Sequence, residues 1–210
     1  MFDKFIERLG AELMKPLPGI EAQLKMAPAF RQRLSQTRIE AKDPKESAVL
    51  ILLFPTQNSI HTVLILRPSY AGVHSGQIGF PGGKLERDED PMHASLREAE
   101  EEIGIDRGSV TVIGRLTQLY IPPSNFLVHP FIGYCLKRPG FVAAKNEVEK
   151  IIEVGINELL ADEIVSAKKV IASGSGIEME VPAIVIDGEV IWGATAMIIS
   201  EMKEIIAKIS

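Results

Sequence analysis

The chain has 210 residues, of which 46% are hydrophobic and 24% are charged, the usual balance of a globular protein with one compact core. This composition excludes a disordered chain, a collagen-like rod and a disulfide-stabilised mini-protein. The 23 Lys and Arg against 28 Asp and Glu give a formal net charge of -5, which argues against a broad basic surface for nucleic acid, so a highly phosphorylated ligand would need a few well-placed cations or metal ions.

The start of the chain predicts an amphipathic helix over residues 1–14 and not a signal peptide. The longest apolar run, residues 48–54, is far shorter than the roughly 20 residues of a membrane helix. Cys135 is the one cysteine, so the chain has no internal disulfide, and its apolar surroundings predict a buried side chain. We therefore expect a protein of the reducing cytoplasm without a membrane partner.

Residues 1–45 are predicted to form a helical extension, broken by prolines, that packs on a main domain of residues 46–210. In this domain, β-branched and leucine-rich runs replace the helical period. The strands predicted from these runs are 48–54, 62–66, 110–114, 131–136, 151–154, 180–186 and 190–192, with a hairpin turn at Asp187-Gly188.

Three helices are predicted in the main domain. The first covers residues 91–104, with Asp88 or Asp90 as its cap, Pro91 in its first turn and Gly104 just past its end. A short helix follows at 156–160, and a last one runs from about 195 to 209 with Thr195 as its cap. The fold class is therefore α/β (α+β), with helices flanking a curved mixed sheet.

Three carboxylates of the first of these helices lie on one narrow face. At about 100° per residue, Glu98, Glu101 and Glu102 point in the same direction. Their mutual repulsion destabilises an isolated helix, so either they form a solvated acidic face or a bound cation rewards the arrangement. A hard divalent ion such as Mg²⁺ or Mn²⁺ prefers such oxygen ligands.

The spacing around these glutamates is specific. The segment contains, without a gap, Gly83, five residues, Glu89, seven residues, Arg97-Glu98, two residues, Glu101-Glu102, one residue, and Gly104-Ile105. This pattern resembles the Nudix box. The resemblance implies a Nudix-type α/β/α sandwich that hydrolyses a nucleoside diphosphate linked to another moiety, with Mg²⁺ or Mn²⁺ held by Glu98, Glu101, Glu102 and the Gly83 carbonyl.

The other charged residues of the box have separate expected roles. Arg97 pairs with Glu101 or Glu89 and fixes the carboxylates, while Glu89 is an outer ligand or a contact through water. His93 faces elsewhere and is expected at the surface. The general base is left open between Glu101 and Glu147, for which an exposed charge is the alternative.

Upstream residues resemble the coenzyme A pyrophosphatase branch of Nudix hydrolases. The similar segments are Leu64–Arg67 and His74–Gly83, where an arginine, a histidine and a Gly-Gln pair lead into Phe-Pro-Gly-Gly. Pro68 and Gly72 depart from the branch, which has a serine and a second arginine there, and the lost arginine weakens the expected grip on a CoA 3′-phosphate.

Three residues remain as candidate substrate contacts, each with a simpler alternative. Arg67 binds phosphate or is a surface charge at a strand end, and His74 either touches the substrate or holds the glycine-rich loop, which we favour. The same two roles, substrate contact or support of the loop, are open for Gln77. Trp192 is expected in the core, and the alternative is a side chain on which adenine stacks.

The leading hypothesis is hydrolysis of CoA or acyl-CoA to 3′,5′-ADP and 4′-phosphopantetheine. The alternatives are another nucleoside diphosphate derivative, such as ADP-ribose, NADH or a dinucleoside polyphosphate, and a non-catalytic nucleotide sensor. Because the box keeps all its carboxylates, the sensor is disfavoured. A homodimer is expected by family analogy alone.

Overall fold

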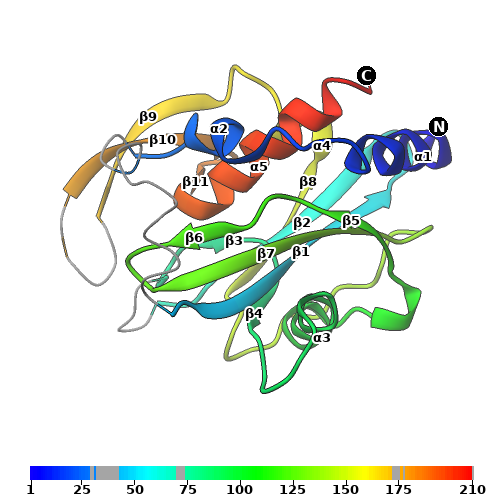
Figure 1. The fold of residues 1–210 in the computed structure, drawn as a ribbon, viewed down its shortest axis with the longest axis horizontal. Coiled ribbons are helices and arrows are strands. Elements are labelled where there is room, and N and C mark those ends of the chain that lie inside the picture. Colours follow the sequence, from blue (N-terminus) through cyan, green and yellow to red (C-terminus); the bar gives the residue numbers. More distant parts are fainter. Residues whose placement is uncertain (29–30, 32–42, 70–73, 172–175, 177, 210) are drawn as a thin grey trace.

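The computed structural model describes residues 1–28, 31, 43–69, 74–171, 176 and 178–209. Two sheets and the helices around them make up this part of the chain (Figure 1). The large sheet has eight strands in the order β3-β2-β1-β7-β5, with β4 paired to β1, β6 to β7 and β8 to β2. Its strands are β1 (Lys45–Pro55), β2 (Ile60–Leu66), β3 (Ile78–Gly79), β4 (Gly82–Lys84), β5 (Thr111–Arg115), β6 (Leu119–Ile121), β7 (Phe126–Tyr134) and β8 (Lys150–Gly155).

The centre of this sheet is a parallel pair, β1 and β7, in which Leu50 lies opposite Phe131. The other pairings of the sheet are antiparallel, so the sheet is mixed as predicted. The two strands predicted at 48–54 and 62–66 are indeed neighbours, joined by a short turn.

Helices cover both faces of the large sheet (Figure 1). On one face lies α3 (Pro91–Ile103), and on the other lie α5 (Gly193–Ile206), α1 (Phe2–Leu13) and α2 (Gly19–Leu24). A short α4 (Ile156–Leu159) follows β8, and a 3-10 turn, Arg107–Ser109, follows α3. The predicted α/β/α sandwich is therefore confirmed.

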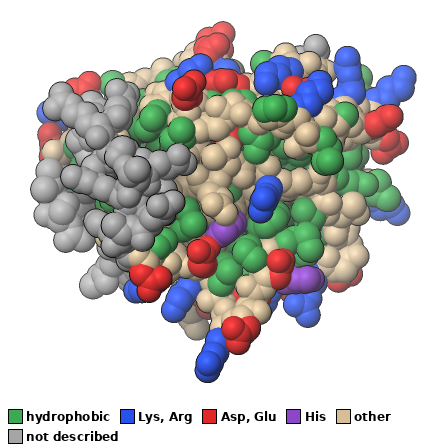
Figure 2. All heavy atoms as spheres, viewed as in Figure 1, with side chains coloured by type: hydrophobic (Ala, Val, Ile, Leu, Met, Phe, Trp, Pro, Cys, Tyr) green, Lys and Arg blue, Asp and Glu red, His purple; other side chains and the backbone are tan. Residues whose placement is uncertain are grey.

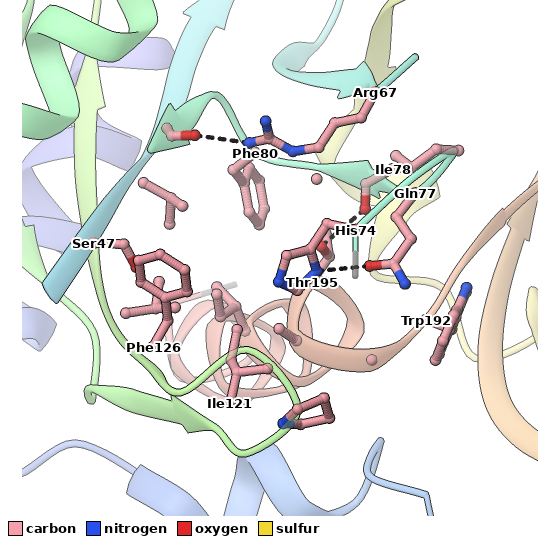
Figure 3. A pocket seen from close by; sticks show the side chains of 18 of the residues that line it. Ser47, Arg67, His74, Gln77, Ile78, Phe80, Ile121, Phe126, Trp192 and Thr195 are labelled. Atoms are coloured by element: carbon pink, nitrogen blue, oxygen red, sulfur yellow. Dashed lines mark hydrogen bonds between the residues drawn. The ribbon is translucent and has the colours of Figure 1, made fainter. Parts of the chain in front are cut away.

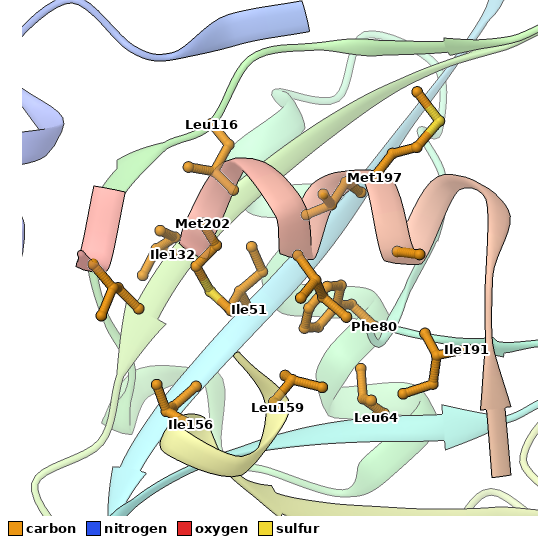
Figure 4. Packing of buried hydrophobic residues seen from close by; sticks show 14 of the residues in the cluster. Ile51, Leu64, Phe80, Leu116, Ile132, Ile156, Leu159, Ile191, Met197 and Met202 are labelled. Carbon is orange, nitrogen blue, oxygen red and sulfur yellow. The ribbon is translucent and has the colours of Figure 1, made fainter. Parts of the chain in front are cut away.

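Alternate residues of β1 supply both halves of the core. Leu50 and Leu52 face α3, whereas Ile51 and Leu53 face α5, and all four are fully buried. Figure 4 shows Ile51 packed near Met202 of α5. Burial on both faces explains why this strand is an uninterrupted apolar run and not an alternating one.

A smaller antiparallel sheet stands beside the large one. It consists of β9 (Val165–Ile171), β10 (Glu178–Ile186) and β11 (Glu189–Ile191). The hairpin turn predicted between β10 and β11 is confirmed, because Asp187 and Gly188 both have positive φ, 49° and 82°. No strand was predicted at β9, which is largely exposed and carries two lysines.

The predicted cap of the last helix is wrong. α5 begins at Gly193, with Trp192 as its N-cap residue. The hydroxyl of Thr195 donates a hydrogen bond to the carbonyl of Ile78 in β3, at 2.9 Å. Thr195 therefore ties the helix to the sheet from inside its first turn and does not cap it.

A fully buried carboxylate, Glu201 of α5, holds the N-terminal helix α2. It accepts hydrogen bonds from the backbone of Gly19 (3.1 Å) and the amide of Gln23 (2.8 Å) in α2. It also accepts from the backbone and hydroxyl of Thr117, the latter at 2.6 Å. Neutral donors from two distant segments therefore satisfy this charge.

The surface carries acidic and basic side chains in mixture over the face shown in Figure 2. Cys135 is buried, as predicted, with its thiol near the hydroxyl of Ser109. None of the helices in the described ranges is long and apolar enough to cross a membrane.

Candidate active site

Helix α3 begins and ends where the sequence predicts. The side chain of Asp90 accepts hydrogen bonds from the backbone N–H groups of Met92 and His93, at 2.9 and 3.3 Å, and Pro91 is the first helical residue. Gly104 ends the helix in the left-handed conformation, with φ of 71°. These limits set the direction in which the glutamates of the helix project. His93 is exposed, as expected.

Arg97 gathers three carboxylates at the edge of this helix. Its guanidinium forms two parallel hydrogen bonds with Glu89, at 2.8 and 2.9 Å. It also donates to Glu98 at 3.0 Å and to Glu101 at 2.9 Å. The bidentate pairing lowers the pKa of the Glu89 carboxyl to about 2. The predicted pairing of Arg97 with Glu89 and Glu101 is therefore present, and Glu98 joins it.

Glu102 is buried beneath the loop that leads into β4. One of its carboxylate oxygens accepts from the backbone N–H of Gly82 at 2.7 Å, and the other from Arg67 at 3.2 Å. Arg67 also donates to the carbonyl of Gly82 at 2.7 Å. Burial raises the pKa of the Glu102 carboxyl to about 7, although Arg67 opposes the shift. Arg67 is thus neither a free surface charge nor an unengaged phosphate ligand in this structure.

Gly83 allows the loop backbone to touch the helix. A Cβ atom at this position would lie 2.3 Å from Oε2 of Glu98, closer than atoms can approach. Burial raises the pKa of the Glu98 carboxyl, with Glu101 and Glu147 adding to the shift. Glu98 and Glu102 therefore lie against the glycine loop, and the charge of Glu101 acts on Glu98 beside them.

Glu147 comes to the same place from a distant loop. This loop packs against the C-terminal end of α3. The backbone N–H groups of Val142 and Ala144 donate there to the carbonyls of Ile103 and Glu102, both at 2.9 Å. The charge of Glu147 contributes to the raised pKa values of Glu98 and Glu102. Glu147 is exposed, and no partner holds its carboxylate within the described residues.

The donor set fits a hard divalent cation in its chemistry. It consists of carboxylate oxygens that raise one another's pKa, beside a glycine backbone with no Cβ to keep a ligand away. Each carboxylate still has unused lone pairs after its hydrogen bonds. Across the described ranges, however, no three His, Cys, Asp or Glu side chains are gathered in a ready-made metal site. Arg97 lies between the carboxylates that would have to converge on an ion.

A cavity of about 330 Å³ opens beside the glycine loop. Gly82, Gly83 and Arg67, which contact Glu98 or Glu102, border it, and Figure 3 shows Arg67 at its edge. Much of the remaining wall is apolar and includes Val49, Phe80, Ile121, Phe126, Trp192 and Ile198. This size and lining are typical of a small-molecule site.

The three residues predicted as substrate contacts all line this cavity: Arg67, His74 and Gln77. His74 and Gln77 form a hydrogen bond with each other, between Nδ1 and Oε1 at 3.1 Å, within the glycine-rich segment. Burial lowers the pKa of the His74 imidazole. Gly72, where the second arginine of the CoA branch is missing, lies outside the described residues.

Other residues of the cavity were not predicted. Trp192 is half-buried in the cavity wall, so its expected place in the core is wrong. Arg31, Lys84, Phe126 and Thr195 also line the cavity. No motif marks them, because each reaches the cavity from a different part of the chain.

The chain is similar to Nudix proteins in sequence. The NUDIX domain model matches residues 44–173, more than half of the chain. An uncharacterized Nudix hydrolase, NudL of Photorhabdus laumondii, is 31% identical over 178 residues, which cover 83% of this chain and 92% of that protein. The chloroplastic Nudix hydrolase 22 of Arabidopsis thaliana is 34% identical over 138 residues, 64% of this chain and 44% of that protein. The chain spans less than half the length of the Arabidopsis relatives that it matches.

Solved structures share the fold. A Nudix hydrolase from M. smegmatis superposes with a TM-score of 0.54 at 16% identity, covering 80% of this chain and 88% of that one. A MutT/nudix family protein from Enterococcus faecalis gives a TM-score of 0.53 at 13% identity, covering 92% and 76%. With the family model matching the segment that carries the carboxylates and the glycine loop, the chain belongs to the Nudix family.

Proposed function

We propose that the protein is a divalent-metal-dependent hydrolase of nucleoside diphosphate derivatives, and that its substrate is CoA or an acyl-CoA. The observation that carries this proposal is the position of the cavity, which borders Gly82 and Gly83 directly beside the carboxylates of α3. A ligand in the cavity can therefore place a diphosphate against the box while the rest of the molecule occupies the apolar part.

The carboxylates would supply the metal site. Glu98, Glu101, Glu102 and the carbonyl of Gly83 would hold a Mg²⁺ or Mn²⁺ ion, which would offset the charge of the diphosphate and make the attacking water easier to deprotonate. Arg97 would release part of its hold on Glu98 and Glu101 and keep Glu89 as a fixed neighbour outside the ligands.

Glu147 is our choice of general base. A base must have a free lone pair and must lie near the water that attacks phosphorus. Glu101 is already bound to Arg97, whereas the Glu147 carboxylate has no such partner in the described residues and faces the same cluster. Glu147 takes the proton of the water as its oxygen bonds to phosphorus, and the bridging P–O bond breaks to leave two phosphate products.

The cavity wall supports a CoA-like substrate. Trp192 lies in a position to stack on an adenine ring, and Arg67 and Lys84 add positive charge near the glycine loop. Hydrolysis would release 3′,5′-ADP and 4′-phosphopantetheine. ADP-ribose, NADH or a dinucleoside polyphosphate is the second candidate, because the box determines the bond and leaves the attached moiety open.

The test is a comparison of kcat/KM for CoA, dephospho-CoA, ADP-ribose and NADH at one Mg²⁺ concentration, with products identified by mass. We expect CoA to be the best of the four. A preference for ADP-ribose would refute the CoA assignment and leave the Nudix chemistry standing.

A second experiment separates the enzyme from a non-catalytic sensor. Glu102→Gln removes a proposed ligand, and we expect turnover of every substrate to fall at least 100-fold. Unchanged turnover would refute the metal site, and no turnover by the unmodified protein would favour the sensor.

Three further assignments are part of the proposal. Residues 1–45 would act as a helical extension of a hydrolase domain, residues 46–210. The free, buried Cys135 supports a reducing, cytoplasmic setting. A homodimer is proposed by family analogy, and light scattering on the purified protein measures it.

A further inference from the structure

The wall of the cavity far from the carboxylates contains an arginine, Arg31, that has no acidic partner among the described residues. Arg31 lines the cavity, and its guanidinium donates to the backbone carbonyl of Tyr120. Among the described residues no carboxylate pairs with it, in contrast to Arg67 and Arg97. Partial burial lowers the pKa of Arg31 to about 10 through lost hydration alone, so the side chain stays charged at neutral pH.

A charge in such a position normally has a counter-ion. Taking a guanidinium out of water costs free energy unless an anion or several acceptors replace the lost hydration. Arg31 has five N–H donors, and one carbonyl satisfies only part of them. The missing acceptors can come from a ligand, because Arg31 lines the cavity.

The place of Arg31 along the cavity limits the ligand group that it can meet. Tyr120 is next to Ile121, and Figure 3 shows Ile121 at the end of the cavity opposite to Arg67 and the Gly82 carbonyl. Phe80 and Phe126 lie between the two ends, and Trp192 lies at one side of the cavity. The cavity therefore has a charged end beside the box, an apolar and aromatic middle, and a second cationic end at Arg31.

We infer that Arg31 binds a phosphomonoester on the nucleoside part of the substrate, a second anionic group separate from the diphosphate that is cleaved. This inference rests on the proposed function and deepens it, because it requires the diphosphate to lie at the box. A planar guanidinium fits a terminal phosphate through two parallel hydrogen bonds, and the aromatic middle fits a base or ribose.

The inference separates two classes of nucleoside diphosphate derivative. CoA and NADPH carry an additional phosphomonoester on the ribose, whereas dephospho-CoA, NADH and ADP-ribose carry none. The Arg31 site should recognise the first class and be indifferent to the second.

Binding of two product-like ligands tests this without relying on turnover. The dissociation constants of adenosine 3′,5′-bisphosphate and of 5′-AMP are measured by calorimetry for the unmodified protein, Arg31→Ala and Arg31→Lys. We expect the bisphosphate to bind about 10-fold or more tightly than AMP, and Arg31→Ala to remove this preference while AMP binding stays the same. Arg31→Lys keeps the charge but loses the paired hydrogen bonds, so it should retain part of the preference.

Arg115→Ala is the matched control, because Arg115 is an exposed arginine that does not line the cavity. It should leave both constants unchanged. The inference would be overturned if Arg31→Ala still bound the bisphosphate more tightly than AMP. It would also be overturned if the substitution weakened the binding of both ligands equally. If Arg31→Ala fails to fold, as judged by its thermal unfolding, the Arg31→Lys comparison still decides.

Kinetics distinguish failure of the inference from failure of the proposed function. In the CoA and dephospho-CoA pair, Arg31→Ala should raise KM for CoA about 10-fold with little change in kcat, and leave dephospho-CoA unaffected. If CoA is not cleaved, but Arg31→Ala raises KM for NADPH and leaves KM for NADH unchanged, the Arg31 site stands and CoA is the wrong substrate. If CoA is cleaved and Arg31→Ala has no effect on the pair, the proposed function stands and the inference is wrong.

Discussion

Gly83 and Glu98 approach so closely that a Cβ atom on residue 83 would lie 2.3 to 2.6 Å from the carboxylate of Glu98. The atoms in conflict belong to the far end of a flexible side chain, so the protein can relieve the clash by moving Glu98. We expect Gly83→Ala to lower kcat at least 10-fold and to raise the Mg²⁺ concentration needed for half-maximal rate, with little change in melting temperature. Gly140→Ala is the control, because Gly140 is exposed and an added Cβ atom would have no described neighbour within 4 Å.

Gly82→Ala should act on stability instead. Here the added Cβ would lie 2.3 Å from the carbonyl oxygen of Ala48 and 2.6 Å from Cα of Val49, and φ is +154°. Backbone atoms of the central strand cannot move away cheaply, so we expect a loss of about 1–3 kcal/mol in the free energy of unfolding. Urea unfolding measures it, and a loss no greater than that of Gly83→Ala would contradict the packing described for β1 and β4.

Glu147→Gln should remove the general base. We expect kcat to fall about 100- to 10,000-fold, with the Mg²⁺ dependence and substrate KM nearly unchanged. Glu149→Gln, two residues away and also exposed, is the matched control and should keep full activity. If Glu101→Gln abolishes turnover while Glu147→Gln does not, the base is Glu101.

Glu201→Ala should detach the N-terminal helix α2. The substitution leaves buried donors of Gly19, Gln23 and Thr117 without an acceptor, and we expect a loss of about 3 kcal/mol or more. Thermal unfolding reports the loss, and faster proteolysis within the first 28 residues reports where it occurs. Glu163→Gln, at an exposed position, should change neither measurement.

Removal of divalent metal should abolish both catalysis and diphosphate binding. The protein carries a formal charge of -5, and several of its acidic residues lie where the diphosphate must sit. With EDTA present, we expect ADP-ribose and CoA to bind at least 10-fold more weakly, and excess Mg²⁺ to restore them. Equal affinity with and without metal would show that arginines alone hold the phosphates.

Local signals in the sequence predict the elements that carry the chemistry. Helix α3 is found to within one residue, because Asp90, Pro91 and Gly104 each act on the backbone beside them. The alignment of Glu98, Glu101 and Glu102 follows from helix geometry alone. The buried strand β1 is visible as an apolar run, although the parallel pairing with β7 has no local signal.

Features that depend on distant segments could not be predicted. Arg67 binds Glu102, which lies 35 residues later in the sequence. Thr195 donates to Ile78, 117 residues earlier, and this tertiary hydrogen bond takes the place of the helix cap expected at Thr195. β9 is a polar edge strand whose only described partner in its sheet, β10, lies later in the chain. Trp192 lines a cavity that several segments of the chain form together. The residues next to Trp192 in the sequence give no sign of that cavity.

The cavity has a mixed origin within the chain. Its side next to the carboxylates belongs to residues 44–173, the part that matches the NUDIX model, whereas Pro28, Arg31, Met179 and Trp192 come from the segments before and after it. The segment that matches the family model thus contains the carboxylates and part of the cavity wall, and the flanking segments complete that wall. Transplanting the two flanking segments between Nudix proteins should therefore exchange their substrate preference while each recipient keeps its own hydrolytic centre.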